Sequence, residues 1–208
     1  FAADFDGNMG LIRDKIPQKT RGKVAVIGSG PAGLTVAGDL AREGFNVMIF
    51  EGEQEAGGVL MYGIPEYRLP KDVVRKEVKK IEALGVTFIT QCMVGQTITV
   101  DDMFEQGFDA VFIGSGTALP KSLDTPGYTR GVTQSSYFLR MASLCNTGSI
   151  GREEVPVKRG DIVGVIGGGN VAMDAARTAL RMGAGKVYVL FRRTMDQMSA
   201  LQTEYNEA

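Results

Sequence analysis

The sequence contains no histidine, and this absence excludes several kinds of catalytic site. A chain without histidine cannot build a Ser-His-Asp relay or a histidine-ligated zinc site, and it lacks the commonest general base. We therefore predict no catalytic side chain and no metal site. Chemistry carried out by this chain is expected to come from a bound cofactor.

Cysteine is scarce as well. The chain has two, Cys92 and Cys145, which stand far apart with no C-x-x-C spacing. Such a pair does not make the framework of a disulfide-rich fold, and a two-cysteine metal or redox pair is the weaker alternative. We expect both side chains to act as small buried or half-buried hydrophobes.

An excess of one charge and long apolar runs are also lacking. The 208 residues carry a net charge of -1, with 44% hydrophobic and 23% charged residues, as in an ordinary globular protein. The absence of a basic excess argues against a nucleic acid partner. No apolar run approaches the ~20 residues that span a bilayer, and the N-terminus lacks a signal-peptide pattern. We therefore expect a cytoplasmic protein with no membrane segment.

Glycine, in contrast, is abundant: the 28 glycines are roughly twice the usual share and gather after apolar runs. The run "KVAVIG" (23–28) precedes a small-residue helix pattern at 31–44 and a second strand pattern, "NVMIFE" (46–51), which predicts a unit with parallel strands. The pattern returns in "DIVGVIGGGNVAMDAARTALRMGAGKVYVLFRR", where Val163–Met173 matches Val24–Leu34. The repeat predicts an α/β protein with two Rossmann-like dinucleotide-binding domains.

Further elements are expected between the two copies of this unit. The stretch 69–85 places Val74, Val78, Ile81 and Leu84 on one face and lysines on the other, which predicts an amphipathic helix. We also predict, in chain order, a strand pair or bent strand at 86–95, a buried strand at 109–116, a short helix at 135–144 and a linker at 145–160.

The first glycine turn carries the pattern of a dinucleotide site. Gly28, Gly30 and Gly33 follow a strand, open a helix and precede the acidic Glu51 by about twenty positions. Gly28 would permit the tight turn, Gly30 the approach of a pyrophosphate to the helix N-terminus, and Gly33 close helix–strand packing. Glu51 would accept hydrogen bonds from an adenosine ribose. The alternative is a tight turn that binds no ligand.

The second copy ends differently. Gly167, Gly169 and Ala172 fill the three glycine positions, but Arg192 and Arg193 stand where the first copy has its acidic residue. A carboxylate would repel a 2′-phosphate, whereas guanidinium groups bind phosphate through planar, charge-assisted contacts. The second site is therefore predicted to take NADP(H) rather than NAD(H). The alternative is a pair of solvated charges at a strand end.

Two dinucleotides on one chain can exchange a hydride. The obvious pair is a nicotinamide and a flavin, because hydride transfer from C4 to N5 needs stacking and orientation rather than a side-chain acid or base. A chain without histidine is compatible with that reaction.

Four stretches resemble one family, in its order along the chain: "GSGPAGLTVAGDLA", "GGVLMYGIPEYRLPK", "GFDAVFIGSGTALPK", and "GGGNVAMDAARTALRMGA" followed by "FRR". The sequence is similar in these stretches to the flavoprotein subunit of NADPH-dependent glutamate synthase and its relatives. Those relatives include the large subunit of NADH-dependent ferredoxin:NADP oxidoreductase and the flavin-and-NADPH part of dihydropyrimidine dehydrogenase. The paired glycine turns occur in many flavin disulfide reductases, whereas the G-I-P-x-x-R-L-P stretch is much narrower.

The resemblance implies FAD at the first turn and NADP(H) at the second. By this similarity the FAD contacts come from Gly28, Gly30, Pro31, Ala32, Gly33, Glu51, Gly58, Val59, Leu60, Arg68, Val94, Gly114, Gly116 and Thr117. Arg68 would lie near the isoalloxazine ring, and the backbone of Val94 would meet the adenine. The NADP(H) contacts would come from Gly167, Gly169, Asn170, Val171, Arg192 and Arg193.

The sequence departs from the family in two respects. It has neither the upstream cysteine-rich iron–sulfur ligation nor the late Gly-Asp motif that closes on the flavin. The resemblance therefore implies a fragment of a longer protein, with a lead-in segment at 1–20 and an FAD-binding domain at 21–150 without its C-terminal return. A partial NAD(P)H-binding domain at 160–208 would follow. Iron–sulfur clusters are expected only in missing segments or in a partner.

The expected function is electron transfer. NADPH and FAD would exchange a hydride, and electrons would pass to iron–sulfur centres or a partner, such as a glutamate synthase large subunit or a ferredoxin-like iron–sulfur protein. A non-catalytic fragment that binds a dinucleotide is the alternative. A flavin disulfide reductase is a weaker alternative, because it needs a C-x-x-C pair.

Overall fold

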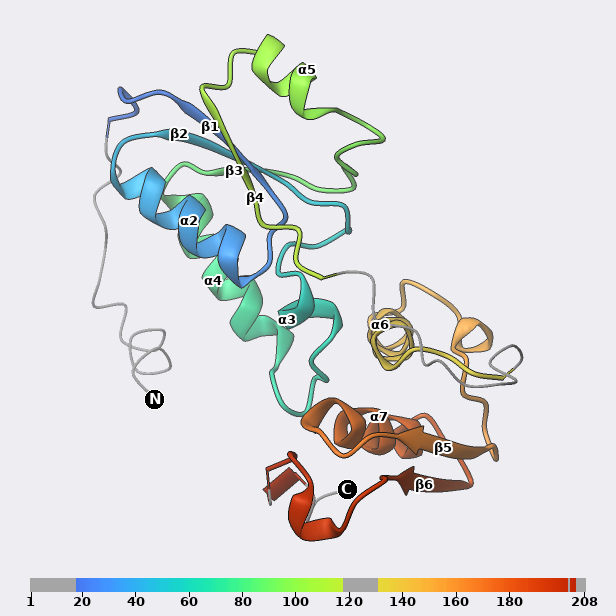
Figure 1. Ribbon diagram of the computed structural model, residues 1–208. Coiled ribbons are helices and arrows are strands. Elements are labelled where there is room, and N and C mark those ends of the chain that lie inside the picture. The colour runs from blue at the N-terminus through green and yellow to red at the C-terminus, as the bar shows by residue number, and fades with distance from the viewer. Residues whose placement is uncertain (1–17, 118–130, 202, 205–208) are drawn as a thin grey trace. The chain divides into compact units, whose positions relative to one another are not determined.

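The computed structural model describes residues 18–117, 131–201 and 203–204 (Figure 1). The chain divides into two compact units. Unit 1 contains the described residues up to Met61 and those from Leu69 to 117, and unit 2 contains Tyr62–Arg68 and the described residues from 131 onward. The segment Tyr62–Arg68 thus belongs to unit 2, although its neighbours in sequence on both sides belong to unit 1.

Unit 1 is built on a parallel sheet. Its strands are β1 (Lys23–Ile27), β2 (Asn46–Phe50), β3 (Thr87–Ile89) and β4 (Ala110–Ile113), in the order β3-β2-β1-β4. Helices α2 (Pro31–Arg42) and α4 (Lys71–Ala83) lie on one side of the sheet and α5 (Val100–Glu105) on the other, with the short α3 (Val59–Tyr62) before α4 (Figure 1). Strand β2 is the neighbour of β1 on one side, and β4 is its neighbour on the other, so the strand order reverses at β1. In such sheets, ligands bind beside the carboxyl ends of the strands at the point of reversal.

Apolar side chains on both faces of this sheet explain its two-sided cover. Central parallel strands are buried on both faces and are therefore apolar along most of their length, as β1 is in "VAVI" (24–27) after its first residue, Lys23. On the side of α5, the rings of Phe50 and Phe108 meet edge to face with centroids 5.8 Å apart, and Met103 is fully buried. The core on the side of α2 and α4 consists of Val26, Leu34, Ala37, Ala41, Val47, Ile49, Leu84 and Val86.

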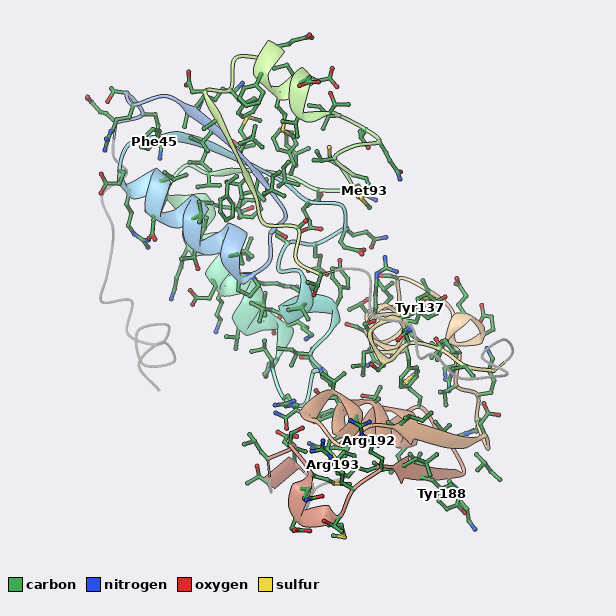
Figure 2. The ribbon with its side chains drawn as sticks, in the orientation of Figure 1. Phe45, Met93, Tyr137, Tyr188, Arg192 and Arg193 are labelled. Atoms are coloured by element: carbon green, nitrogen blue, oxygen red, sulfur yellow. The ribbon has the colours of Figure 1, made fainter. Side chains whose placement is uncertain are left out.

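Unit 2 contains the second copy of the repeat. Strands β5 (Ile162–Ile166) and β6 (Lys186–Leu190) pair in parallel, and α7 (Asn170–Arg181) connects them. Helix α6 (Ser135–Asn146) packs on α7. The unit also has two short 3-10 turns, η1 (Arg152–Glu154) between α6 and β5, and η2 (Met195–Gln197) after β6. The core of the unit consists of Phe138, Leu139, Ala142, Val155, Val157, Ala175 and Ala179. Alternate residues of β5 and β6 face this core, while Tyr188 projects away from α7 (Figure 2).

The structure confirms the α/β class and the internal repeat, because both copies form a strand, a glycine turn, a helix and a parallel strand. The amphipathic helix at 69–85 and the helix at 135–144 also form, as α4 and α6. The stretch 86–95 is neither a strand pair nor a bent strand. Only Thr87–Ile89 is a strand, and Val94 makes an isolated bridge with Ile98.

Two boundaries differ from those expected. The predicted linker at 145–160 contributes Val155 and Val157 to the core of unit 2, so the prediction of a linker is wrong. Helix α6 falls within the residues assigned to the first domain, 21–150, yet Phe138 and Leu139 are buried in the same core as Ala175 of α7. Helix α6 therefore belongs with the second repeat. The lead-in segment at 1–20 lies almost entirely outside the described residues.

Candidate dinucleotide-binding sites

The first glycine turn leaves no room for side chains at two positions. Gly28 follows β1 with a φ of 92°, a left-handed conformation that favours glycine. A β-carbon on Gly28 would lie 2.6 Å from the carbonyl oxygen of Gly114, which follows β4. A β-carbon on Gly33 would overlap the carbonyl oxygen of Gly28. Strand β1, helix α2 and the end of β4 therefore meet backbone to backbone at the point where the strand order reverses.

Gly30 has a different role. It is the N-cap of α2, with an ordinary φ of -67°, and no side chain caps the helix there. A β-carbon on Gly30 would have no atom within 4 Å. Gly58 approaches Gly30 closely, because a β-carbon on Gly58 would lie 2.9 Å from the Gly30 Cα. The start of α2 thus presents backbone donors to open space, which is the arrangement in which helix N-termini bind phosphate.

Glu51, just after β2, is buried and fixes the first turn. Its Oε2 accepts a hydrogen bond from the Ser29 backbone nitrogen at 2.9 Å and another from the Ser29 hydroxyl, while its Oε1 accepts from the Glu53 nitrogen at 2.9 Å. The Ser29 hydroxyl in turn accepts from the Gly57 nitrogen at 2.9 Å. Carboxylate oxygens each have two acceptor positions, so this carboxylate can still accept hydrogen bonds from a ribose.

Ser29 was not selected from the sequence, although it joins the glycine turn, the end of β2 and the segment at Gly57. Its side chain is fully buried. The signal was available as a small hydroxyl residue between Gly28 and Gly30, where its side chain can bond to both Glu51 and Gly57.

Helix α4 holds the segment from Glu55 to Leu60, which runs into the start of α3. Lys71 is buried, and its Nζ donates to the carbonyl oxygen of Leu60 at 2.8 Å. Arg75 donates to the two carboxylate oxygens of Glu55 at 2.8 and 3.2 Å. The hydrogen bonds from Arg75 lower the pKa of Glu55 below its ordinary value. The predicted contacts Gly58, Val59 and Leu60 therefore lie on a segment held at both ends.

The second glycine turn repeats this plan with different packing. Gly167 follows β5 with a φ of 139°, and a β-carbon on Gly168 would lie 2.6 Å from the ring of Phe191. Gly169 is the uncapped N-cap of α7 with an ordinary φ of -100°. The nearest atom to a β-carbon on Gly169 would be the Ser199 hydroxyl oxygen, 3.4 Å away. As in the first turn, a glycine with positive φ ends the strand and an open glycine begins the helix.

The two strand endings differ in burial as well as in charge. Arg192 and Arg193 follow β6 with exposed side chains (Figure 2). Neither guanidinium makes a hydrogen bond or an ion pair with another of the described residues. Glu51, which directly follows β2 in the first copy, is buried and bonded to its own turn. By strand register it corresponds to Phe191, so the arginines come one and two positions later. Phosphate would find the arginine donors available without breaking an existing ion pair to a described residue.

Four of the remaining predicted residues begin the two helices, Pro31 and Ala32 in α2 and Asn170 and Val171 in α7. The others fall in three places. Gly116, with a φ of 69°, and the exposed Thr117 follow Gly114 after β4. Val94 is half-buried against the core around Met103 in unit 1. Arg68 lies in unit 2, where its guanidinium pairs with Asp174 at 2.8 Å and with Glu204 at 3.2 Å. The sequence had associated Arg68 with a flavin ring, and that role stays a prediction.

The donor groups of both turns fit a dinucleotide pyrophosphate, because each turn combines an open N-cap glycine with an uncapped helix start. Within residues 18–117, 131–201 and 203–204, no three Cys, Asp or Glu side chains are grouped so that they could hold a metal ion. In the same part of the chain, no helix is long and apolar enough to cross a membrane. Both cysteines are free, Cys92 buried and Cys145 half-buried.

Two parallel strand–turn–helix repeats with open N-cap glycines define a protein of the doubly Rossmann-like class. A family model described as pyridine nucleotide-disulphide oxidoreductase matches residues 22–207. The chain therefore belongs to the pyridine nucleotide-disulphide oxidoreductase family.

Individual relatives show which proteins of this family the chain is similar to. The NADP(+)-dependent formate dehydrogenase subunit beta of Moorella thermoacetica is 42% identical over 189 residues, covering 89% of this chain and 26% of the relative. A putative glutamate synthase [NADPH] small chain of Cereibacter sphaeroides is 39% identical over 186 residues, covering 89% of this chain and 45% of the relative. The resemblance to glutamate synthase flavoprotein subunits is thereby confirmed. The chain spans less than half the length of these relatives.

Solved structures support the fold. Mycobacterium tuberculosis FprA in complex with NADPH has a TM-score of 0.75 and 23% identity, and the match covers 90% of this chain and 47% of that one. At this level of identity the likeness establishes a shared Rossmann-like architecture.

Proposed function

We propose that this chain is the dinucleotide-binding part of an NADPH-dependent flavoprotein. Unit 1 would be the FAD-binding domain, with FAD at the turn between β1 and α2, and unit 2 the NADP(H)-binding domain, with NADP(H) at the turn between β5 and α7. One observation carries the proposal: two turns of matching plan end in opposite ways, in a buried carboxylate and in two exposed guanidinium groups. A site rimmed by arginine favours a 2′-phosphate, and a site with a fixed carboxylate favours a free ribose hydroxyl.

The chain's own residues would bind and orient, without taking or giving protons. FAD, when bound, supplies a flavin N5 that accepts the hydride from nicotinamide C4. Gly30 and Gly169 would let each pyrophosphate reach a helix N-terminus, and Glu51 would hold one ribose in a fixed orientation. Holding two reactants in alignment lowers the barrier without any side-chain acid or base.

The relatives support a role within a larger assembly, because their names describe a formate dehydrogenase subunit and a glutamate synthase small chain. We infer that electrons leave the flavin one at a time for iron–sulfur centres on other segments or on a partner subunit. A cytoplasmic location agrees with such partners. The terminal acceptor would be set by those partners.

Visible spectroscopy tests the proposal directly. The protein is mixed with excess FAD, desalted, and its absorbance recorded before and after anaerobic addition of NADPH, with NADH in parallel. Retained flavin that is bleached by NADPH in preference to NADH is the expected result. A protein that retains flavin but is not bleached by either cofactor would be the non-catalytic dinucleotide-binding protein instead. Absence of any flavin after reconstitution contradicts FAD as the ligand of this chain.

A matched pair of glycine variants separates the two sites. Gly30→Ala and Gly169→Ala each add one methyl group at an N-cap with ordinary φ, where neither meets a prohibitive contact within its unit. Both variants should therefore fold, as judged by circular dichroism and melting temperature. Gly30→Ala should lose FAD and keep NADP+ binding, and Gly169→Ala should do the reverse. Equal loss of both ligands in both variants would contradict the assignment of one dinucleotide to each turn.

The nucleotide preference rests on the arginines. Replacing Arg192 and Arg193 by alanine should weaken NADP+ binding by at least about 100-fold, since each charge-assisted bond to phosphate contributes roughly 1.5–3 kcal/mol and about 1.4 kcal/mol is a factor of ten. Binding of NAD+ should change little, because it has no 2′-phosphate. Calorimetric titration with each ligand measures the ratio of the NADP+ affinity to the NAD+ affinity. A ratio unchanged from wild type would mean that the two guanidinium groups are ordinary solvated charges.

A further inference from the structure

Four charged side chains of unit 2 form a chain of ion pairs that includes two residues of α7. Arg68 donates to Asp174 at 2.8 Å and lies 3.2 Å from Glu204, and Arg177 donates to the second oxygen of Glu204 at 2.7 Å. Asp174 and Arg177 belong to α7, and their side chains are about as buried as core residues. The network therefore ties three separate stretches together: the segment Tyr62–Arg68, helix α7, and Glu204 near the end of the described chain.

An aromatic ring completes the attachment of Arg68 to this helix. The Tyr67 ring is covered by Arg177 at 4.3 Å and by Arg181 at 4.0 Å, and its hydroxyl donates to the carbonyl oxygen of Asp174 at 3.3 Å. Burial raises the pKa of this hydroxyl above its ordinary value. The segment that carries Arg68 is thus seated on α7 by stacking as well as by charge.

A short strap that precedes Glu204 in the chain lies on the second glycine turn. We define the strap as Met198–Leu201. Its Ala200 nitrogen donates to the Gly168 carbonyl oxygen at 3.0 Å, and its Leu201 nitrogen donates to the Asn170 side-chain oxygen at 2.9 Å. Through these bonds, Ser199 is brought to 3.4 Å from where a β-carbon of Gly169 would stand. The strap therefore borders the open N-cap of α7.

The chain between β6 and Glu204 is consequently held at both ends. It leaves β6, passes the exposed Arg192 and Arg193, crosses the glycine turn as the strap, and is anchored by Glu204 to Arg68 and Arg177. A loop that is ordered before a ligand arrives loses less conformational entropy on binding. The anchor thus determines how well placed the strap and the two arginines are for a dinucleotide.

We propose that Arg68 is a positioning residue of the second dinucleotide site, which acts through Glu204 and Asp174 to hold the strap over the turn between β5 and α7. The inference rests on the proposed NADP(H) site and adds to it a residue from a segment far away in sequence. It also gives Arg68 a role other than contact with a flavin. Removing this guanidinium leaves Asp174 and Glu204 facing each other without their shared cation, and the end of the strap loses one of its two anchors.

The network is poorly explained as a device for stability alone. Buried ion pairs gain little net stability over apolar packing, because desolvation offsets the attraction. One carboxylate oxygen of Asp174 is buried and accepts no hydrogen bond from any described residue. An apolar cluster would hold α7 at lower cost, whereas an ionic anchor fixes one orientation of the strap.

Binding measurements on wild type and five variants test the proposal. Arg68→Met removes the charge and keeps the length of the side chain, and Glu204→Gln removes the opposite charge of the anchor. The double variant Arg68→Met/Glu204→Gln tests whether the two act together, and Arg68→Lys keeps a charge that can still reach one carboxylate. Arg159→Met removes an exposed arginine of the same unit and serves as the control. NADP+ and NAD+ affinities are measured by calorimetry, flavin content by absorbance, and folding by melting temperature.

We expect Arg68→Met and Glu204→Gln each to weaken NADP+ binding about tenfold, with little change in flavin content. The double variant should be no more than about twofold worse than either single one, since both break the same anchor. Arg68→Lys should recover most of the lost affinity. Amide exchange should be faster in peptides of the strap in Arg68→Met than in wild type or Arg159→Met, whether or not ligand is present.

Three results would overturn the proposal. One is NADP+ affinity in Arg68→Met within twofold of wild type. Another is loss of flavin in Arg68→Met with NADP+ affinity retained, which would mean that Arg68 acts at the flavin. The third is full additivity of the two single variants. Failure of the proposed function itself has a separate signature, because wild-type protein would then bind no NADP+, and this result would overturn the inference together with the function.

Discussion

Replacing Ser29 by alanine is the most direct test of how the first turn is built. The Ser29 side chain is fully buried and makes two bonds that no other group can replace. Its hydroxyl donates to Glu51 Oε2 and accepts from the Gly57 nitrogen at 2.9 Å. Alanine keeps the backbone and the β-carbon, so the change removes only these two bonds.

The expected loss follows from the two groups left behind. The buried Gly57 N–H would lose its acceptor, which costs about 1–3 kcal/mol. Glu51 would lose one donor, and a hydrogen bond to a charged group contributes about 1.5–3 kcal/mol. Because the carboxylate keeps the backbone donors at Ser29 and Glu53, we take the lower end of that range. The free energy of unfolding of unit 1 should therefore fall by about 2.5–4.5 kcal/mol.

Hydrogen exchange followed by mass spectrometry, combined with urea unfolding, measures this loss. A decrease of 2 kcal/mol corresponds to roughly 30-fold in an equilibrium constant, so peptides that contain Gly57 should exchange at least that much faster. Thr35→Ala, which removes an exposed hydroxyl from α2, should stay within ~0.5 kcal/mol of wild type. If Ser29→Ala is as stable as Thr35→Ala and exchanges at the wild-type rate, the hydroxyl does not hold the turn together.

Three further predictions concern packing, capping and pH. Gly33→Ala should prevent unit 1 from folding, because the added methyl group overlaps the Gly28 carbonyl oxygen, and circular dichroism would detect the loss. Thr99→Ala removes the N-cap of α5 and should lower the free energy of unfolding by about 1 kcal/mol in urea titrations. Burial raises the pKa of Asp174, against the opposing effect of Arg68, so the stability contributed by its protonated form is lost as the pH rises through that raised pKa. Arg68→Met should raise the pKa of Asp174 further, and its deficit in melting temperature relative to wild type should grow from pH 4 to pH 7; a constant deficit would contradict this reasoning.

The architecture could be predicted from the sequence because its main signals are local and occur twice. A β-branched run, a glycine turn and a small-residue helix define each copy, and no distant contact is needed to recognise them. The unit to which α6 belongs was predicted wrongly because it depends on distant contacts rather than on a local signal. The apolar residues of this helix could face either unit, and only the tertiary packing of Phe138 with Ala175 decides between them. The stretch 145–160 misled through its glycines, its one proline and its charges, which surround two buried valines, Val155 and Val157.

The residues of the candidate sites divide in the same way, into those that a local pattern predicts and those whose contacts depend on the tertiary fold. The glycines could be chosen by spacing. Gly28, Gly33 and Gly167 are required by a close backbone approach or a positive φ, and Gly30 and Gly169 stand at the starts of helices. Ser29 and Arg68 could not be assigned their contacts in that way. The partners of Ser29 are Glu51 and Gly57, and the partners of Arg68 stand more than a hundred positions further along the chain. Such contacts arise only when the sheet or the helix has brought distant segments together.

The two strand endings differ in what a ligand would have to change. At the first turn the carboxylate of Glu51 is already fixed by three donors, so a ribose would add bonds to an organised group. At the second turn Arg192 and Arg193 are exposed, and the order of the site resides in the strap and in its anchor at Glu204. A rigid first site suits a cofactor that stays bound, whereas exposed donors on an anchored loop suit one that must arrive and leave in every turnover. The same repeat can thus serve a resident and an exchanging dinucleotide, because the two copies differ in where their rigidity lies.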